Sequence, residues 1–247
     1  MEHVINKDKF DAVLFDLDGV LTATAKVHAV CWKKLFDTFL KKRAAAMNNT
    51  FQPFDIESDY KLYVDGRLRY EGVQSFLESR DIQLPHGNPG DTPNYDTVCG
   101  LGNMKDELVH KVIESDGVEV YDGSVKLVQH LQTQGIKTGV VSASKNCKTV
   151  LKAAGIIDLF EIIVDGEVAA QLQLPGKPAP DTYLRGAEEF GVDPKRAVVI
   201  EDAISGVQAG RNGGFGLVIG VDRKDNAGEL RDNGADVVVK DLGELVS

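Results

Sequence analysis

Acidic side chains that could act on a phosphate group occur in two short segments of this sequence. Asp16 and Asp18 alternate around a leucine just before a glycine, and Glu201 and Asp202 stand side by side much later in the chain. Mg²⁺ is a hard cation that prefers oxygen ligands. We therefore predict a Mg²⁺ cofactor with these ligands: Asp16, the backbone carbonyl of Asp18, and Asp202 with help from Glu201.

Two other segments carry groups that bind phosphate oxygens. Ser142 begins the hydroxyl- and amide-containing stretch 142–146, and Lys177 lies in the proline-containing loop 176–181. Charge spreads over the non-bridging oxygens during phosphoryl transfer, so Ser142 and Lys177 are expected to bind them. Each segment alone is weak evidence, because turns, helix caps and solvated edges use the same residue types. Together the four segments supply the parts that phosphoryl transfer requires.

The two acids of the first segment suit different tasks. Asp16 is the predicted nucleophile, since its attack on phosphorus would give an aspartyl-phosphate and split one difficult displacement into two. Asp18 is the predicted general acid and base, because the leaving oxygen needs a proton and the incoming hydroxyl must lose one. The predicted activity is Mg²⁺-dependent phosphoryl transfer through a phosphorylated enzyme.

Short apolar runs, typical of buried strands, alternate with helical patterns along much of the chain. The runs cover residues 11–15, 136–141, 162–164, 197–200, 217–219 and 237–239. The alternation predicts an α/β fold whose core is a doubly wound, Rossmann-like parallel sheet. Ligands gather beyond the carboxyl ends of parallel strands, so the chemistry-bearing residues are expected to meet at one edge of this sheet.

One segment, 25–116, interrupts the alternation. Apolar residues fall at helical spacing near its start, and no strand pattern follows them. Residues that form turns and loops concentrate at 48–59 and 85–94. We predict a helical inserted domain over 25–116 and a phosphoryl-transfer core formed by 1–24 and 117–247.

Composition limits the partners and the compartment. Hydrophobic residues make up 43% and charged residues 27%, as in ordinary globular proteins, and the net charge of −10 disfavours nucleic acid and anionic membranes as partners. No stretch has the apolar length of a membrane span, and the first residues lack a secretory signal pattern, which favours the cytoplasm. Cys31, Cys99 and Cys147 lack CxxC spacing, so no disulfide framework or zinc site is expected. The sequence leaves the oligomeric state open, with a monomer favoured.

In this order, the four segments resemble the four motifs of the haloacid dehalogenase superfamily, and the resemblance covers residues 11 to about 215. The helical insertion after the first motif is similar to the family's mobile cap domain of the helical type. Within the family, the sequence looks most like the β-phosphoglucomutase-like subgroup, on the basis of 142–146, 176–181, Thr22-Ala23-Thr24, His28 and Trp32. The resemblance implies an enzyme that acts on a small sugar phosphate.

The resemblance also implies roles for residues of the core. It makes Asp16 the nucleophile and Asp18 the acid/base, and the implied metal ligands are Asp16, Asp18, Glu201 and Asp202. The implied site for the transferring phosphate consists of Ser142, Ala143 and Lys177. A mutase must also hold the distal phosphate of a sugar bisphosphate, and Lys145 and Asn146 match that second site.

In the insertion, Arg69 aligns with the family's cap arginine when Gly66 serves as the anchor, and Arg67 is a rival for that role. The other residues implied for the substrate and the cap are Lys105, which matches a sugar-contacting lysine, His28 and Thr24 at the hinge region, and Trp32. Each also has an ordinary interpretation, since Trp32 suits the core of the insertion and the cations suit a solvated face. The sequence departs from the family pattern at Ala23, Ala203 and Asp106, which bears on sugar specificity.

Three functions stay open from the sequence. The leading one is a mutase that interconverts β-glucose 1-phosphate and glucose 6-phosphate through an aspartyl-phosphate and a sugar bisphosphate. The second is a phosphatase for a small phosphorylated metabolite, with water as the final acceptor. The third is a phospho-signalling receiver, which shares the sheet, the aspartate, Mg²⁺ and a lysine. Asp18 and the insertion argue against the receiver, because it needs neither a proton shuttle nor a lid.

Overall fold

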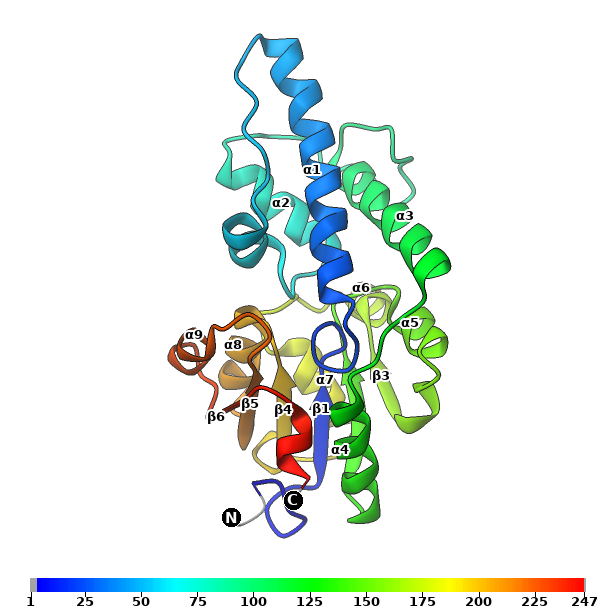
Figure 1. Ribbon diagram of the computed structural model, residues 1–247, viewed down its shortest axis with the longest axis vertical. Coiled ribbons are helices and arrows are strands. Elements are labelled where there is room, and N and C mark those ends of the chain that lie inside the picture. Colours follow the sequence, from blue (N-terminus) through cyan, green and yellow to red (C-terminus); the bar gives the residue numbers. More distant parts are fainter. Residues whose placement is uncertain (1–3, 247) are drawn as a thin grey trace. The chain divides into compact units, whose positions relative to one another are not determined.

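Six apolar segments form one parallel sheet in the computed structural model, which describes residues 4–246. The strands are β1 (Ala12–Phe15), β2 (Lys137–Val141), β3 (Ile162–Val164), β4 (Ala197–Glu201), β5 (Leu217–Val221) and β6 (Val237–Val239). Their order is β3-β2-β1-β4-β5-β6, and every neighbouring pair is parallel. Helices cover both faces of the sheet, so the predicted doubly wound α/β fold is confirmed (Figure 1).

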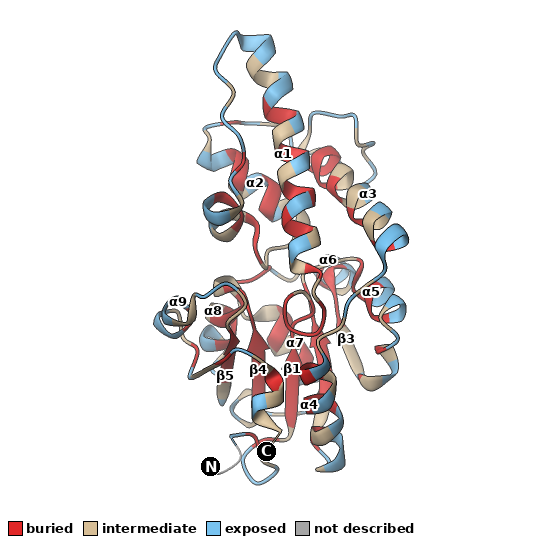
Figure 2. Ribbon diagram, in the orientation of Figure 1, coloured by how far each residue is buried: buried red, intermediate tan, exposed pale blue. Residues whose placement is uncertain are grey.

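The central strands explain why the sequence shows continuous apolar runs instead of alternation. Every residue of β1 and β4 is buried, because helices pack on both faces (Figure 2). Phe15 at the end of β1 pairs with Val140 of β2 on one side and with Ile200 of β4 on the other. The residues that follow these positions therefore emerge together at the carboxyl edge of the sheet.

The chain divides into two compact units. The core unit contains the residues up to Thr24 and those from Val118 onward, and the inserted unit is Ala25–Gly117. Besides the sheet, the core unit contains α4 (Asp122–Thr133), α5 (Cys147–Ala153), α6 (Gly166–Leu172), α7 (Asp181–Phe190), α8 (Ile204–Asn212), α9 (Ala227–Asp232) and the short 3₁₀ helices η2 (Ile157–Leu159), η3 (Pro194–Arg196) and η4 (Leu242–Leu245).

The inserted unit has its own core of stacked aromatic rings. Its helices are α1 (Ala25–Met47), the π-helix η1 (Ile56–Val64), α2 (Arg69–Ser79) and α3 (Val98–Asp116). The ring of Phe36 lies 5.3 Å from that of Trp32 and 4.1 Å from that of Phe76, measured between centroids. Trp32 is thus a core residue of this unit, 3% exposed.

One loop prediction in the inserted unit is correct for residues 48–55 and wrong for residues 56–59. Residues 48–59 were expected to be a loop, but η1 begins at Ile56. Asp55 caps it by accepting a hydrogen bond from the Ser58 amide at 2.8 Å, and the Tyr60 amide donates to the Asp55 carbonyl at 3.1 Å. Burial of Tyr60 in the aromatic core outweighs the weak helix tendency of the surrounding polar residues.

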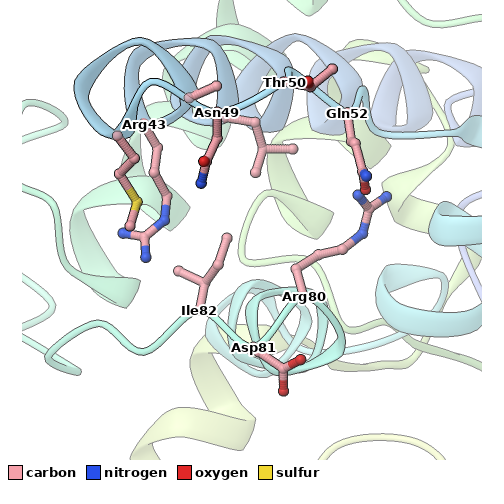
Figure 3. A pocket seen from close by; sticks show the side chains of 10 residues that line it. Arg43, Asn49, Thr50, Gln52, Arg80, Asp81 and Ile82 are labelled. Carbon is pink, nitrogen blue, oxygen red and sulfur yellow. The ribbon is translucent and has the colours of Figure 1, made fainter.

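A cavity of about 420 Å³ lies in the inserted unit between the end of α1 and the end of α2. Figure 3 shows Arg43 and Asn49 reaching into it from one side and Ile82 from the other. Asp81 is the one acid among its lining residues, so this cavity lacks the carboxylates that phosphoryl transfer would require.

Two expectations about the whole chain can be compared with the described part. Cys31, Cys99 and Cys147 are buried and form no disulfide in the described part of the chain. Among the residues that the structure describes, none of the helices combines the length and apolarity needed to cross a bilayer.

Candidate active site

Three acids converge at the carboxyl edge of the sheet. Asp16 follows β1, Glu201 ends β4 and Asp202 comes next, and one carboxylate oxygen of each lies within 4.8 Å of the others. All three side chains are buried. Two glycines make this packing possible: a Cβ atom at Gly19 would lie 2.3 Å from Asp202 Oδ2, and one at Gly206 would lie 1.9 Å from the carboxylate of Glu201.

Lys177 joins two of these acids. Its Nζ atom lies 2.6 Å from Asp16 Oδ1 and 2.6 Å from Glu201 Oε1, and it lies 5.0 Å from the centre of the Tyr183 ring. The side chain is 2% exposed, so these bonds form with little competition from water. The lysine therefore fixes the orientation of both carboxylates.

The site carries more negative than positive charge. Burial raises the pKa of Asp16 well above its usual value, the Glu201 carboxylate raises it further, and Lys177 opposes both. Burial disfavours the charged form of Lys177, but Asp16 and Glu201 outweigh it and raise the lysine pKa above its usual value. Lys224 approaches Asp202 Oδ2 at 3.6 Å. A further cation beside the three acids would relieve the remaining repulsion.

The donor set fits a hard divalent cation. Asp16, Glu201 and Asp202 offer only carboxylate oxygens, which suit Mg²⁺ or Ca²⁺ better than softer metals. Within residues 4–246, no histidine or cysteine belongs to this group of acids. The residues present thus fit the metal that the family resemblance implies.

Asp18 lies apart from that trio of acids and is tied to the loop that follows it. The Thr24 hydroxyl donates a short hydrogen bond to Asp18 Oδ1, and Thr24 Oγ1 lies 2.7 Å from Thr22 Oγ1. Thr22 and Thr24 are both buried. The threonine pair holds the Asp18 carboxyl two residues beyond the nucleophile.

The loop after β2 presents hydroxyl and amide groups at the same edge. Ser142 is buried, and its Oγ accepts a hydrogen bond from the Ser144 amide at 3.1 Å. The Ser144 hydroxyl in turn accepts a hydrogen bond from the Asn146 amide at 3.1 Å. Asn146 is buried, and Ala143 and Lys145 are half-buried. These bonds shape a compact turn at the start of α5.

In the inserted unit, two pairs form among the predicted residues. Arg69 lies 2.5 Å from Asp106, and Lys105 Nζ lies 2.8 Å from His28 Nδ1. The ammonium of Lys105 also lies 5.1 Å from the centre of the Trp32 ring. Arg69 therefore contacts one of the residues at which the sequence departs from the family pattern.

Two residues of the site carried no sequence signal. The buried Tyr183 hydroxyl donates to Glu201 Oε1 at 2.9 Å, and Arg223 Nε donates to the Gly19 carbonyl at 2.8 Å. Tyr183 falls at the core spacing of a predicted helix, and Arg223 lies beyond the last motif. Their positions, Tyr183 beside Glu201 and Arg223 beside Gly19, follow from the three-dimensional structure and not from the sequence pattern.

The comparisons with known proteins agree with this geometry. The sequence pattern of the haloacid dehalogenase-like hydrolase family matches residues 10–214. A β-phosphoglucomutase from Mycobacterium bovis is 47% identical over 242 residues, covering 97% of this chain and 92% of the relative. One from Bacillus subtilis is 30% identical, covering 95% and 91%. The solved structure of a Clostridium difficile β-phosphoglucomutase has a TM-score of 0.74 at 26% identity, covering 96% of this chain and 93% of that one. The chain belongs to the haloacid dehalogenase-like hydrolase family.

Proposed function

We propose that this chain is a β-phosphoglucomutase, a phosphoryl-transfer enzyme that interconverts β-glucose 1-phosphate and glucose 6-phosphate. The observation that carries the proposal is the 47% identity to a β-phosphoglucomutase along nearly the whole of both chains. The buried group of Asp16, Lys177 and Glu201 supports it, because phosphoryl transfer needs a fixed nucleophile among compensating charges.

Asp16 is the proposed nucleophile. Its carboxylate oxygen forms a bond to phosphorus as the bond from phosphorus to the sugar oxygen breaks, which leaves an aspartyl-phosphate. In the reverse direction a sugar hydroxyl takes the phosphoryl group from Asp16. Asp18 gives a proton to the departing sugar oxygen and removes one from the attacking hydroxyl. Transfer to one hydroxyl and then from the other, through a sugar bisphosphate, completes the isomerisation.

The transferring phosphate needs cationic and hydrogen-bonding partners in a protein of net charge −10. We assign this task to Lys177, the Ser142 hydroxyl and the backbone at Ala143. The proposed ligands of the divalent cation are Asp16, Asp18, Glu201 and Asp202, and Mg²⁺ is the proposed ion. When bound, it would neutralise charge between the nucleophile and the phosphate.

The other phosphate of the bisphosphate requires a second binding group. Lys145 and Asn146 in the core unit, and Arg69 in the inserted unit, are the proposed residues. Lys105 is the proposed contact to the sugar, and its ammonium is held by His28. A cytoplasmic location and a monomeric state remain predictions.

A phosphatase of the same family is less favoured, because a relative 47% identical and another 30% identical, each spanning both chains almost completely, are β-phosphoglucomutases. The signalling-receiver hypothesis is set aside, since the chain belongs to a family of phosphoryl-transfer enzymes.

Phosphorus NMR tests the proposal directly. With Mg²⁺ and a trace of sugar bisphosphate, β-glucose 1-phosphate should convert to glucose 6-phosphate with little free phosphate, and Asp16→Asn should convert none. Arg69→Ala should lose isomerisation yet release phosphate, whereas Arg67→Ala, the matched control, should isomerise normally. Rapid phosphate release from many sugar phosphates without any isomer would exclude the mutase.

A further inference from the structure

The two connections between the units are paired with each other inside the core unit. The chain leaves this unit after Thr24 and returns at Val118. The Ala23 amide donates to the Glu119 carbonyl at 2.9 Å, and the Tyr121 amide donates to the Leu21 carbonyl at 3.0 Å. The outgoing segment 19–24 and the returning segment 118–121 therefore form one short two-stranded connector.

Arg223 contacts both halves of this connector. It follows β5, and its Nε donates to the Gly19 carbonyl at 2.8 Å. Its guanidinium contacts the returning segment, with Cζ 3.6 Å from the centre of the Tyr121 ring. Its Nη1 donates to the Lys240 carbonyl at 3.0 Å, which anchors the side chain to the end of the sheet. The side chain is 16% exposed.

The contacts of Arg223 are ones that a guanidinium makes and an ammonium does not. A planar fork can donate along two directions while its face stacks on an aromatic ring. Nη2 is buried without a hydrogen-bond partner among the described residues, so this arginine is partly desolvated for the sake of its other contacts. Burying a guanidinium nitrogen without a hydrogen-bond partner is unexpected for an ordinary surface arginine.

We propose that Arg223 is a positioning residue for the proposed phosphoryl transfer, acting through the connector on Asp18. Gly19 directly follows Asp18, and the same connector carries Thr22 and Thr24, which hold the Asp18 carboxyl. The Gly19 backbone also packs against Asp202. By holding the Gly19 carbonyl and the Tyr121 ring together, Arg223 keeps the Asp18 carboxyl at a fixed position relative to the nucleophile Asp16.

The inference rests on the proposed function. The experiment therefore tests the function and the role of Arg223 by separate measurements. Isomerisation of β-glucose 1-phosphate by the unchanged protein tests the function. Arg223→Ala and Arg223→Lys are then compared with Arg211→Ala, a control at an arginine of α8 whose side chain is 65% exposed. We expect Arg223→Ala to lower kcat about tenfold or more with KM little changed, because a charged hydrogen bond to a catalytic loop is lost. Arg223→Lys should recover only part of kcat.

Hydrogen exchange gives the second measurement. Amides of 19–24 and 118–121 should exchange faster in Arg223→Ala, and Tyr121→Leu should produce the same change in the same two segments. Arg211→Ala should leave them unchanged. The inference is overturned if Arg223→Ala and Tyr121→Leu have the same kcat as Arg211→Ala and the same hydrogen-exchange rates in the connector. If the unchanged protein does not isomerise the sugar, hydrolysis of p-nitrophenyl phosphate replaces that assay, and the same comparison still decides the role of Arg223.

Discussion

Lys177 is the residue on which the charge balance of the site depends. Its ammonium contacts Asp16 and Glu201 at 2.6 Å each, and all three side chains are buried. Removing one partner of a buried ion pair is far more damaging than replacing the whole pair, because an uncompensated charge remains. The lysine should therefore matter for folding as well as for binding phosphate.

We predict that Lys177→Met, which keeps the length of the side chain but removes its charge, lowers kcat at least about 100-fold. It should also lower the free energy of unfolding by about 3 kcal/mol, since two buried carboxylates lose their counter-charge. Steady-state kinetics and urea unfolding measure the two effects. Lys195→Met, at an exposed position, is the control. Normal turnover by Lys177→Met would contradict the role assigned to this lysine.

At the level of single residues, the sequence identifies side chains that follow strands but not those that support them. Asp16 and Glu201 meet because β1 and β4 are parallel neighbours. The apolar runs predict a parallel sheet whose strand ends share one edge, but they do not predict which strands are neighbours. Tyr183 and Arg223 could not be predicted, since a tyrosine at core spacing and an arginine in a polar loop fit ordinary roles equally well. Their partners are set by how α7 and the loop after β5 pack.

At the level of elements, the strands were predictable from their short apolar runs. The runs 162–164 and 237–239 match β3 and β6, and the run 197–200 extends by one residue to Glu201 in β4. The helix η1 was not predictable, because its stability comes from Tyr60 and Val64 entering the aromatic core and not from local preference. Elements fixed by tertiary contacts leave little trace in the sequence.

The strands β1 and β4 are also joined at their amino ends. Asp11 precedes β1 and Arg196 precedes β4, the Asp11 amide donates to the Arg196 carbonyl at 2.8 Å, and Arg196 Nη2 donates to Asp11 Oδ1 at 3.1 Å. The hydrogen bonds from Arg196 and from Lys7 lower the pKa of Asp11 from 3.8 to about 2. An acid with a lowered pKa stabilises the fold above its unfolded pKa, and this contribution disappears as pH falls toward 2.

We predict that Asp11→Asn lowers the urea midpoint slightly at pH 6, since the pair is exposed and weak. The difference from the unchanged protein should shrink as the pH falls from 3.8 toward 2, because protonation then removes from Asp11 the charge that the Asp11→Asn variant already lacks. Urea titrations across this range measure it, with Asp232→Asn, an exposed acid in α9, as the control. A difference that grows on acidification would show that Asp11 does not act through this ion pair.

At the level of the whole molecule, each unit has a separate apolar core. The core unit buries residues on both faces of its sheet, such as Val13 and Leu14 of β1, and the inserted unit buries its aromatic rings around Phe36. The chain leaves and re-enters the core unit through the paired connector, where the Ala23 amide donates a hydrogen bond to the Glu119 carbonyl. The two points of the core unit that flank the insertion are thus held together by hydrogen bonds within that unit. The core unit therefore has the contacts needed to fold alone.

We predict that the core unit survives removal of the insertion. Joining Thr24 to Val118 through a linker of about four glycine and serine residues should give a chain that unfolds cooperatively, because the connector supplies its own hydrogen bonds. This chain should hydrolyse p-nitrophenyl phosphate but should not isomerise β-glucose 1-phosphate, since the aspartyl-phosphate would be open to water and Arg69 would be absent. Circular dichroism and phosphorus NMR measure folding and products, and the same deletion with Asp16→Asn should be inactive. Isomerisation at the full-length rate would show that the insertion takes no part in catalysis.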